Sequence, residues 1–323
     1  MERKKLLEVT DLRKQFVVSR NFLTRKRTCV NAVNGITLDI KSGETLGLVG
    51  ESGCGKSTLG RTILRLIPMT SGKVVFDGND IGALSEEQMR QMRRRMQMIF
   101  QDPYSCLNPR MNVLELVKAP LDIFQIGTPK ERMDKVREML EIVGLGEHHL
   151  MRYPHEFSGG QRQRIGIARA LIAGAEFVVC DEPVSALDVS VRASVLNLMQ
   201  QLQKQFGLTY LFISHDLSVV KHISDRVAVM YLGEIVEITT KDLLYDKPLH
   251  PYTQALLSAI PIPDTKVTVK PQILEGELPS PYAPPAGCRF HTRCRFCMEK
   301  CKEIAPLLKD MGDDHQVACH LYE

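Results

Sequence analysis

The chain has 323 residues, of which 44% are hydrophobic and 25% are charged. These are ordinary values for a globular protein, so they argue against a disordered or fibrous chain, and the length allows one large domain with an appendage. The 42 basic and 38 acidic side chains leave a net charge of +4, which is too small to indicate nucleic-acid binding. We find no signal peptide and no apolar run of the roughly 18 to 20 residues that a membrane helix needs, so we expect a soluble protein without its own membrane pore.

The N-terminal region has the pattern of two short strands, at residues 6–10 and 28–40. They flank a polar, basic connection, so we expect an antiparallel hairpin with a long loop. The loop is either a solvated excursion or a contact with a membrane surface or a membrane subunit. Its basic residues are Arg20, Arg25, Lys26 and Arg27.

Residues 50–57 read GESGCGKS, which fits a phosphate-binding loop between the apolar strand TLGLV and a helix. Its glycines let backbone amides face phosphate oxygens, and the helix N-terminus adds partial positive charge. Lys56 is expected to neutralise phosphate charge and Ser57 to ligate Mg²⁺, whereas the alternative is a chance glycine-rich turn. The expected nucleotide contacts are Gly50, Glu51, Ser52, Gly53, Cys54, Gly55, Lys56, Ser57 and Thr58.

Further strand-like apolar runs alternate with helical stretches, which favours an α/β core with a largely parallel sheet. Between about 105 and 170 the chain is rich in helical patterns, and Gly144 is a plausible end for one of them. We therefore expect a helical subdomain inserted into the sheet order. The strand-like runs lie at 73–76, 96–100, 177–180, 208–213 and 227–230.

The run from Phe177 to Cys180 ends in two acids, Asp181 and Glu182. A parallel sheet delivers such carboxylates to a nucleotide at its carboxyl edge. Asp181 suits the Mg²⁺ shell, and Glu182 is expected to be the general base that polarises the attacking water. The alternative is an acidic pair that starts a turn before Pro183.

Shortly before these acids stands Ser158-Gly159-Gly160-Gln161, and the motifs in this order resemble those of the ABC ATPase family over about residues 5–245. Phe157 replaces the more usual leucine. The resemblance implies an α/β P-loop NTPase core with an antiparallel β subdomain and the inserted helical subdomain. It also implies that residues 158–161 bind the γ-phosphate of ATP held by a second subunit, so that each catalytic site is shared.

The same resemblance assigns roles to other positions. Gln101 is similar to the family's Q-loop glutamine, which touches Mg²⁺ or the attacking water, and residues 102–110 would face a membrane subunit. Residues 185–188 resemble the D-loop at the dimer interface, where Asp188 would lie. His215 resembles the switch histidine that contacts the γ-phosphate, and Phe16 either stacks on adenine or belongs to the core.

The last quarter of the chain differs in composition. Residues 261–287 are rich in proline, which is typical of a linker. We divide the chain into a nucleotide-binding domain at 1–250 and an extension with a small Cys-rich domain at 251–323. HPYTQALLSAIP at 250–261 and EGELPSPYAPPAGCRFHTRC at 275–294 resemble the extension of dipeptide and oligopeptide importer ATPases.

This resemblance implies an ATP-hydrolysing motor that drives peptide uptake, peripheral on the cytoplasmic face of the inner membrane. SGGQRQRIGIARAL is similar to the F-type subunit, so the expected partners are a D-type ATPase, two transmembrane permeases and an extracytoplasmic peptide-binding protein, without nucleic acid. The alternatives are import of nickel, opines or another small solute, and a soluble ABC protein that acts on DNA or ribosomes.

The C-terminal cysteines follow the spacing Cys288-x5-Cys294-x6-Cys301-x17-Cys319, with Cys297 additional. A protein that consumes cellular ATP belongs in a reducing compartment, where structural disulfides are not expected. Four thiolates can hold a [4Fe-4S] cluster or Zn²⁺, and spacing does not decide between them. The resemblance implies the cluster, with zinc or unliganded thiols as alternatives.

Three neighbouring groups make the ligand set ambiguous. They are Cys297, His291 and, as a weaker candidate, His320.

A separate hypothesis concerns Cys54, inside the phosphate loop. Amide dipoles could favour its thiolate there, and the alternative is an ordinary, unreactive thiol.

Overall fold

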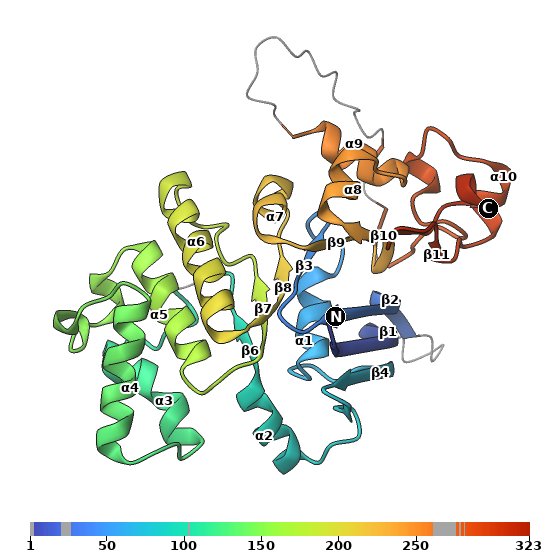
Figure 1. The fold of residues 1–323 in the computed structure, drawn as a ribbon. Helices are drawn as coiled ribbons and strands as arrows, with labels where there is room; N and C mark the ends of the chain where they lie inside the picture. Colours follow the sequence, from blue (N-terminus) through green and yellow to red (C-terminus); the bar gives the residue numbers. More distant parts are fainter. Residues whose placement is uncertain (1–2, 21–26, 103, 261–275, 278, 281) are drawn as a thin grey trace, which may run out of the picture. The chain divides into compact units, whose positions relative to one another are not determined.

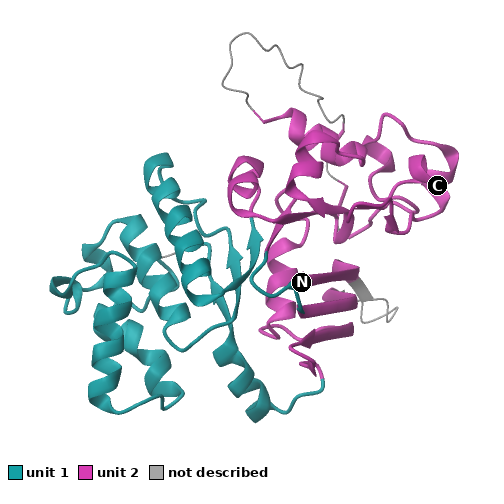
Figure 2. Ribbon diagram, viewed as in Figure 1, with its two compact units in different colours: residues 1–4, 41–44, 83–213 teal, residues 5–40, 45–82, 214–323 magenta. Residues whose placement is uncertain are grey.

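The computed structural model describes residues 3–20, 27–102, 104–260, 276–277, 279–280 and 282–323 (Figure 1). Most of the predicted basic loop and most of the proline-rich linker lie outside these residues. The chain divides into two compact units (Figure 2). Unit 1 comprises residues 1–4, 41–44 and 83–213, and unit 2 comprises residues 5–40, 45–82 and 214–323.

Unit 2 contains an antiparallel sheet whose strand order is β2-β1-β4-β5. β1 pairs antiparallel with β4, and Leu7 lies opposite Phe76 in that register. Both side chains are fully buried, as expected for alternating positions on the inner face. The two predicted N-terminal strands are thus neighbours, and β1 is longer than its pattern suggested. The strands are β1 (Lys5–Arg20), β2 (Arg27–Lys41), β4 (Ser71–Phe76) and β5 (Asn79–Asp80).

The second sheet segment of unit 2 runs in the order β11-β12-β10-β9-β3. β3 and β9 are parallel, whereas β10 is antiparallel to both β9 and β12. The predicted strand around 227–230 is confirmed, while β10, β11 and β12 were not predicted. The strands are β3 (Thr45–Val49), β9 (Arg226–Tyr231), β10 (Glu234–Thr240), β11 (Lys309–Asp310) and β12 (Gln316–Val317).

Four helices of unit 2 follow or flank these strands. Helix α1 begins directly after the glycine loop that ends β3, as its sequence predicted. Helix α7 packs so closely on β3 that a Cβ on Gly47 would lie 2.6 Å from Cγ1 of Val220. The helices are α1 (Lys56–Ile63), α7 (Leu217–Ile223), α8 (Lys241–Asp246) and α9 (Pro251–Ser258).

Unit 1 contains three parallel strands in the order β8-β7-β6. Every residue of β7 and β8 is buried, which explains why both read as continuous apolar runs without alternation. All three strands coincide with predicted ones. They are β6 (Met96–Ile99), β7 (Phe177–Asp181) and β8 (Thr209–Ile213).

The predicted helix-rich stretch is confirmed in unit 1, where α3, α4 and α5 pack against one another. Helix α4 begins with a capping box on Thr128 and ends just before Gly144, whose φ of 76° suits glycine. Two short 3-10 helices, Glu147–His149 and Pro154–Glu156, follow. The helices of the unit are α2 (Glu86–Arg95), α3 (Val113–Ile123), α4 (Pro129–Ile142), α5 (Gly159–Leu171) and α6 (Val189–Phe206).

The cysteine-containing segment after residue 287 has little regular structure. It consists of a 3-10 turn (His291–Arg293), helix α10 (Glu299–Glu303), β11, β12 and a final 3-10 turn (His320–Tyr322). The segment joins the sheet of unit 2 through the pairing of β12 with β10. None of the helices among the described residues has the length and apolar character that spanning a bilayer requires.

Candidate functional site

The glycine loop between β3 and α1 packs against the main chain at Met230 and at Ala32. A Cβ on Gly50 would lie 2.1 Å from the Met230 carbonyl oxygen, and one on Gly55 would lie 2.1 Å from that of Ala32. Both glycines have positive φ, at 152° and 107°. Gly53 also has a positive φ, of 80°, but no atom lies within 4 Å of its Cβ position. The loop is therefore closely packed at its ends and open at its middle.

Lys56, the first residue of α1, is only 5% exposed. Its ammonium donates hydrogen bonds to the carbonyl oxygens of Gly50, at 2.7 Å, and Glu51, at 2.9 Å. The loop thus holds a buried positive charge at the start of an eight-residue helix, where an anion is favoured. Ser57 and Thr58, which follow it in α1, are half-buried, while Ser52 is exposed.

Cys54 is buried within the loop, with 2% of its surface exposed. Burial raises the pKa of its thiol, and the opposing effect of Lys56 is smaller. The hypothesis that loop dipoles favour a thiolate here is therefore wrong, because loss of solvent outweighs the nearby positive charge.

Glu51 is held by side chains that the sequence analysis did not connect with it. Its backbone N–H donates to the Tyr252 hydroxyl at 2.9 Å, and its carboxylate pairs with the Arg293 guanidinium at 2.8 Å. Both partners come from beyond residue 250. No sequence pattern signals such long-range pairs.

Two further predicted residues lie in unit 2. Phe16 is 40% exposed, with the Lys14 ammonium 4.9 Å from its ring centre, so the alternative that it belongs to the core is wrong. His215 is exposed in the turn after β8. The turn is fixed on both sides, because Ser214 N–H donates to the Leu48 carbonyl and the Asp216 carboxylate caps α7.

Unit 1 brings Gln101 and Glu182 together. The Gln101 side-chain amide donates to the Glu182 carboxylate at 3.0 Å. Glu182 has a φ of 47°, an uncommon backbone conformation for a non-glycine residue that occurs often at functional sites. Asp181, the last residue of β7, is 1% exposed. The end of β7 and Gln101, which follows β6, thus meet within one unit, as expected for neighbouring parallel strands.

The motif at 158–161 opens helix α5. Ser158 and Gln161 form a capping box in which each side chain accepts a hydrogen bond from the other's backbone N–H, at 3.3 and 3.0 Å. A Cβ on Gly160 would lie 2.2 Å from Cγ1 of Val191 in α6. A Cβ on Gly159 would lie 3.3 Å from Cδ2 of Leu187, in the predicted D-loop. The motif and the D-loop are therefore packed together.

Asp188 lies at the N-cap of α6, where its side chain makes no capping hydrogen bond and is exposed. Of the residues predicted for the nucleotide site, unit 2 thus holds the glycine loop, Phe16 and His215. Unit 1 holds Gln101, Asp181, Glu182, residues 158–161 and Asp188.

The C-terminal thiols lie close enough to one another to affect the protonation of Cys288 and Cys319. Burial, with smaller contributions from the thiols of Cys301, Cys319 and Cys294, raises the pKa of Cys288 to about 12 against the opposing effect of a backbone hydrogen bond from Phe290. Burial likewise raises the pKa of Cys319 to about 11. Among the described residues, no group of three or more His, Cys, Asp or Glu side chains is arranged so that it could hold a metal ion. The donor chemistry suits a thiolate-bound centre, but the side-chain geometry is not that of a formed one.

The two histidines that the sequence left as alternative ligands have ring nitrogens close to backbone oxygens. His291 Nδ1 lies 2.9 Å from the Cys288 carbonyl, and His320 Nε2 lies 2.8 Å from the Ile304 carbonyl. His320 Nδ1 also lies 2.8 Å from the Glu323 carboxylate. These contacts favour structural roles for both rings.

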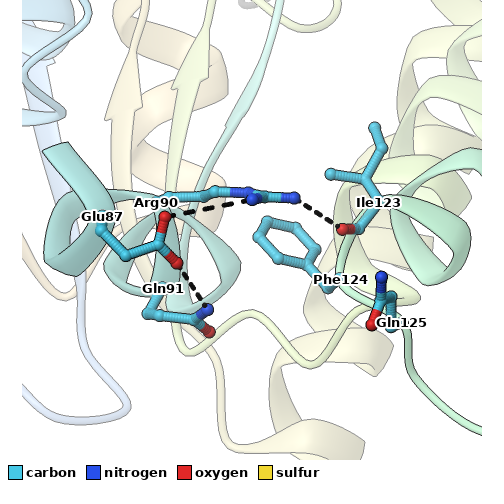
Figure 3. A pocket seen from close by; sticks show the side chains of 6 residues that line it. All are labelled: Glu87, Arg90, Gln91, Ile123, Phe124 and Gln125. Carbon is cyan, nitrogen blue, oxygen red and sulfur yellow. Dashed lines mark hydrogen bonds and ion pairs between the residues drawn. The ribbon is translucent and has the colours of Figure 1, made fainter.

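A surface pocket of about 210 Å³ in unit 1 lies where α2 meets the end of α3 (Figure 3). Arg90 crosses it, donating to the Ile123 carbonyl at 3.1 Å. The pocket contains none of the predicted site residues. Its lining consists of Glu87, Arg90, Gln91, Ile123, Phe124 and Gln125.

Comparison with known families and proteins agrees with this arrangement of motifs. Residues 33–185 match the family described as ABC transporter. Residues 236–301 match a second family, described as oligopeptide/dipeptide transporter, C-terminal region. The two matches do not overlap, so core and extension are recognised independently.

Several relatives match over nearly their whole length. The chain is 55% identical over 320 residues to the oligopeptide transport ATP-binding protein AppF of Bacillus subtilis, covering 98% of this chain and 97% of that protein. It is 50% identical over 323 residues to the oligopeptide transport ATP-binding protein OppF of Salmonella typhimurium, covering 98% and 96%.

Solved structures are similar as well. The ATP-binding cassette MJ0796, in a dimeric post-hydrolysis state bound to ADP and Pi, superposes with a TM-score of 0.65 at 28% identity, covering 73% of this chain and 98% of that one. The cassette cbiO1 from Clostridium perfringens gives a TM-score of 0.64 at 26% identity, covering 76% and 92%.

Proposed function

Since this chain belongs to the ABC transporter family of ATP-binding proteins, we propose that it is the ATP-hydrolysing motor of a membrane importer for dipeptides or oligopeptides. The observation that supports this proposal most directly is the second family match, at residues 236–301, which adds a peptide-transporter extension to the ABC core. Relatives named for oligopeptide transport align over 96–97% of their own length, so the extension is part of the similarity.

The glycine loop is the proposed phosphate-binding element. Lys56 would exchange its present carbonyl partners for phosphate oxygens, and the amides of residues 50–55 would face the same oxygens. Ser57 would ligate Mg²⁺ beside Thr58 at the start of α1. Support comes from the open side of the loop at Gly53 and from the buried ammonium of Lys56.

Hydrolysis is proposed to depend on the acids after β7. Asp181 would hold Mg²⁺ directly or through water, with Gln101 completing its shell. Glu182 would polarise the attacking water, and His215 would contact the γ-phosphate. The hydrogen bond between Gln101 and Glu182 supports a common task for these two residues.

The ATPase is proposed to work as a pair with a second, D-type subunit. Residues 158–161 and Asp188 would face the partner's nucleotide, because the N-terminus of α5 favours an anion. Phe16 would stack on adenine, for which its exposed ring is suited. The solved cassette MJ0796 is dimeric, which supports pairing as a property of this fold.

The remaining partners follow from the role of an importer motor. We propose two transmembrane permeases, contacted through residues 102–110, and an extracytoplasmic peptide-binding protein. The chain would then lie peripherally on the cytoplasmic face of the inner membrane, without a nucleic-acid partner.

We also propose that Cys288, Cys294, Cys301 and Cys319 hold a metal centre, a [4Fe-4S] cluster in preference to Zn²⁺, with Cys297 as the alternative ligand. The effect of the neighbouring thiols on the pKa values of Cys288 and Cys319 supports the proximity of the four side chains. Such a centre would fix the C-terminal segment structurally. After anaerobic purification we expect about four iron atoms per chain and a visible charge-transfer absorbance, by analogy with known cysteine-bound clusters; stoichiometric zinc without iron would contradict the cluster.

The transported solute is tested by uptake in the assembled importer. Labelled peptide is offered together with an excess of unlabelled dipeptide, longer peptide or Ni²⁺. We expect the peptides to compete and Ni²⁺ to leave uptake unchanged. An assembly that takes up labelled Ni²⁺ but no labelled peptide would instead be a metal importer, and a chain that copurifies with no membrane subunit would contradict the importer role.

A further inference from the structure

Glu51, the second residue of the glycine loop, is held from two sides by the end of the chain. Tyr252, 201 residues further on, accepts a hydrogen bond from its backbone N–H at 2.9 Å. Arg293, 242 residues further on, pairs with its carboxylate at 2.8 Å. One contact fixes the loop's main chain and the other its charge. All three residues belong to unit 2.

Arg293 is fixed by the turn in which it stands. The turn lies between Cys288 and Cys294, and the backbone N–H of Cys288 donates to the Cys301 carbonyl at 2.8 Å. The Arg293 N–H donates to the carbonyl of Phe290, whose ring is fully buried. With 9% of its side chain exposed, Arg293 has lost most of its freedom before any ligand binds.

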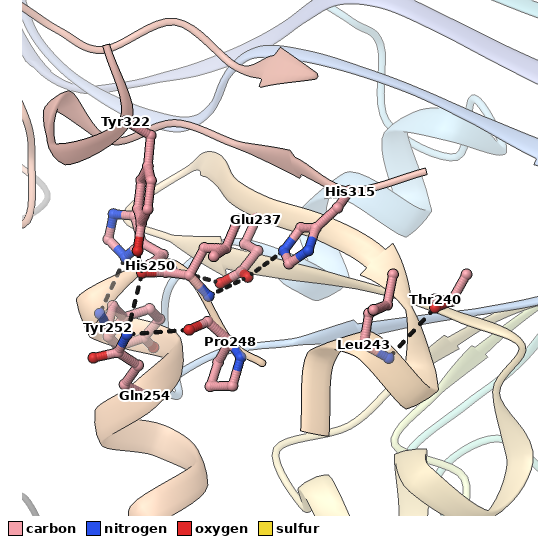
Figure 4. Close-up of polar contacts among 10 residues, drawn as sticks. Glu237, Thr240, Leu243, Pro248, His250, Tyr252, Gln254, His315 and Tyr322 are labelled. Carbon is pink, nitrogen blue, oxygen red and sulfur yellow. Dashed lines mark hydrogen bonds and ion pairs between the residues drawn. The ribbon is translucent and has the colours of Figure 1, made fainter. Parts of the chain in front are cut away.

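Tyr252 is fixed by a buried polar network around Glu237 in β10 (Figure 4). The Glu237 carboxylate is completely buried and accepts hydrogen bonds from the N–H groups of Leu249 and His250, at 2.8 and 3.0 Å. His315, from the C-terminal segment, lies 2.7 Å from the same carboxylate. This network anchors the first turn of α9, and Tyr252 is in that turn.

Aromatic packing connects Tyr252 with Phe290, at the start of the turn that carries Arg293. The ring of Tyr252 lies 4.7 Å from that of Tyr231 and 5.4 Å from that of Phe290. All three rings are fully buried. The turn after Tyr231 also reaches the loop, because the Gly233 N–H donates to the Cys54 carbonyl at 2.9 Å. A buried cluster of aromatic rings thus supports the contacts that Tyr252 and Arg293 make with Glu51.

The ion pair has an electrostatic consequence for an anion-binding loop. A free carboxylate at Glu51 would repel phosphate groups that approach the amides of the same loop. Arg293 neutralises this charge, and its planar guanidinium holds the carboxylate in place. The Tyr252 contact adds order to the loop, so less conformational freedom is lost when a nucleotide binds.

We propose that Arg293 and Tyr252 are positioning residues for nucleotide binding, so that the C-terminal cysteine segment sets the affinity of this chain's phosphate loop. This inference rests on the proposed ATPase function. It gives the extension a task in the nucleotide cycle of its own subunit.

The test compares variants of the full-length chain. Mg·ATP binding is measured by calorimetry, and the KM and kcat of ATP hydrolysis are measured in the assembled importer. Arg289→Ala is the matched control, because Arg289 is 10% exposed in the same segment and pairs at 2.8 Å with Glu234, outside the loop. Circular dichroism and thermal unfolding check that each variant is folded.

We expect Arg293→Ala to raise the Kd and the KM roughly tenfold with kcat within about twofold, since a charged hydrogen bond is lost outside the reacting atoms. Arg293→Lys should recover most of the affinity because it retains the positive charge. Adding Glu51→Gln to Arg293→Ala should recover part of it, because no unpaired carboxylate remains. Tyr252→Phe should raise the Kd by about threefold, and Arg289→Ala should change it by less than about twofold.

Equal effects of Arg293→Ala and Arg289→Ala would overturn the inference, as would wild-type affinity in folded Arg293→Ala. If Arg293→Ala does not fold, Arg293→Lys and the double variant decide, and a tenfold loss in both would also overturn it. Failure of the wild-type chain itself to bind Mg·ATP would instead refute the proposed function. The two failures are therefore distinguishable.

Discussion

The side-chain amide of Gln101 donates a 3.0 Å hydrogen bond to the carboxylate of Glu182. Glu182 stands directly after a fully buried strand and has a φ of 47°. Its backbone N–H donates to the Ile213 carbonyl at 3.0 Å, which holds this uncommon conformation in place. The carboxylate is thus fixed by its own backbone and by the residue that follows the neighbouring strand.

Replacing Glu182 tests whether this carboxylate acts as the general base. Glu182→Gln keeps the shape of the side chain, so Mg·ATP binding should persist while turnover falls by roughly 10²- to 10⁴-fold. Phosphate release by the assembled importer measures this. Glu176→Gln is the control, because Glu176 is paired with Arg95 at the opposite end of β7 and should leave turnover near the wild-type rate. Multiple turnovers by Glu182→Gln would assign the base to another residue.

Gly160 has a packing role besides any contact with nucleotide. A Cβ there would lie 2.2 Å from Val191, so Gly160→Ala should lower the free energy of unfolding by about 1–3 kcal/mol. Denaturant titration measures the loss, and adding Val191→Ala should relieve it. In the same helix, Gly166 has no atom within 4 Å of its Cβ position, so Gly166→Ala should be neutral or stabilising. Equal stability of the two alanine variants would contradict this packing.

The neutral state of His250 makes stability depend on pH. Burial lowers the pKa of His250 from 6.5 to about 4, although Glu237 opposes this shift. Between pH 6.5 and pH 4 the unfolded chain binds more protons at this histidine than the folded chain does. The contribution of His250 to the free energy of unfolding is therefore fully present above pH 6.5 and is lost as the pH falls towards 4. The expected loss from this group is about 3 kcal/mol.

His250→Asn is the variant that isolates this effect, because Asn can cap α9 but does not titrate. We expect its unfolding free energy to vary less with pH than that of the wild type between pH 6.5 and 4. The unfolding free energy is obtained from denaturant titrations at each pH. The same pH dependence in both proteins would contradict the assignment.

Cys54 should react slowly with thiol reagents. The thiol is 2% exposed and burial raises its pKa, so both access and thiolate fraction are low. Mass spectrometry after iodoacetamide treatment should find modification of half-buried Cys29 well before that of Cys54. Faster labelling of Cys54 would indicate that the loop opens readily.

Local signals in the sequence were sufficient for much of the fold. The glycine loop predicted the start of α1, and short apolar runs predicted β6, β7 and β8. In β7 and β8 every residue is buried, because buried parallel strands need no polar face. Gly144 likewise marked the end of α4. β10 was not predicted, since its apolar residues are interrupted by Glu237, which is buried only because it serves a polar network.

The sequence identified the candidate site residues but not their contacts. The pair of Glu51 and Arg293 joins positions 242 residues apart, and only tertiary packing brings them together. Phe16 was ambiguous because strand pattern does not reveal which aromatic ring stays exposed. The two alternatives for Cys54 could not be separated because the depth of its burial depends on contacts with Gly233 and other distant residues.

The central claim is that ATP hydrolysis by this chain drives peptide uptake. It is tested most directly by the ATP-dependent accumulation of a labelled peptide in proteoliposomes that contain the assembled importer, with wild-type chain or with Glu182→Gln. The account predicts peptide accumulation that requires ATP and is lost in the variant. Undiminished accumulation with Glu182→Gln, or none with the wild-type chain in an intact assembly, would contradict it.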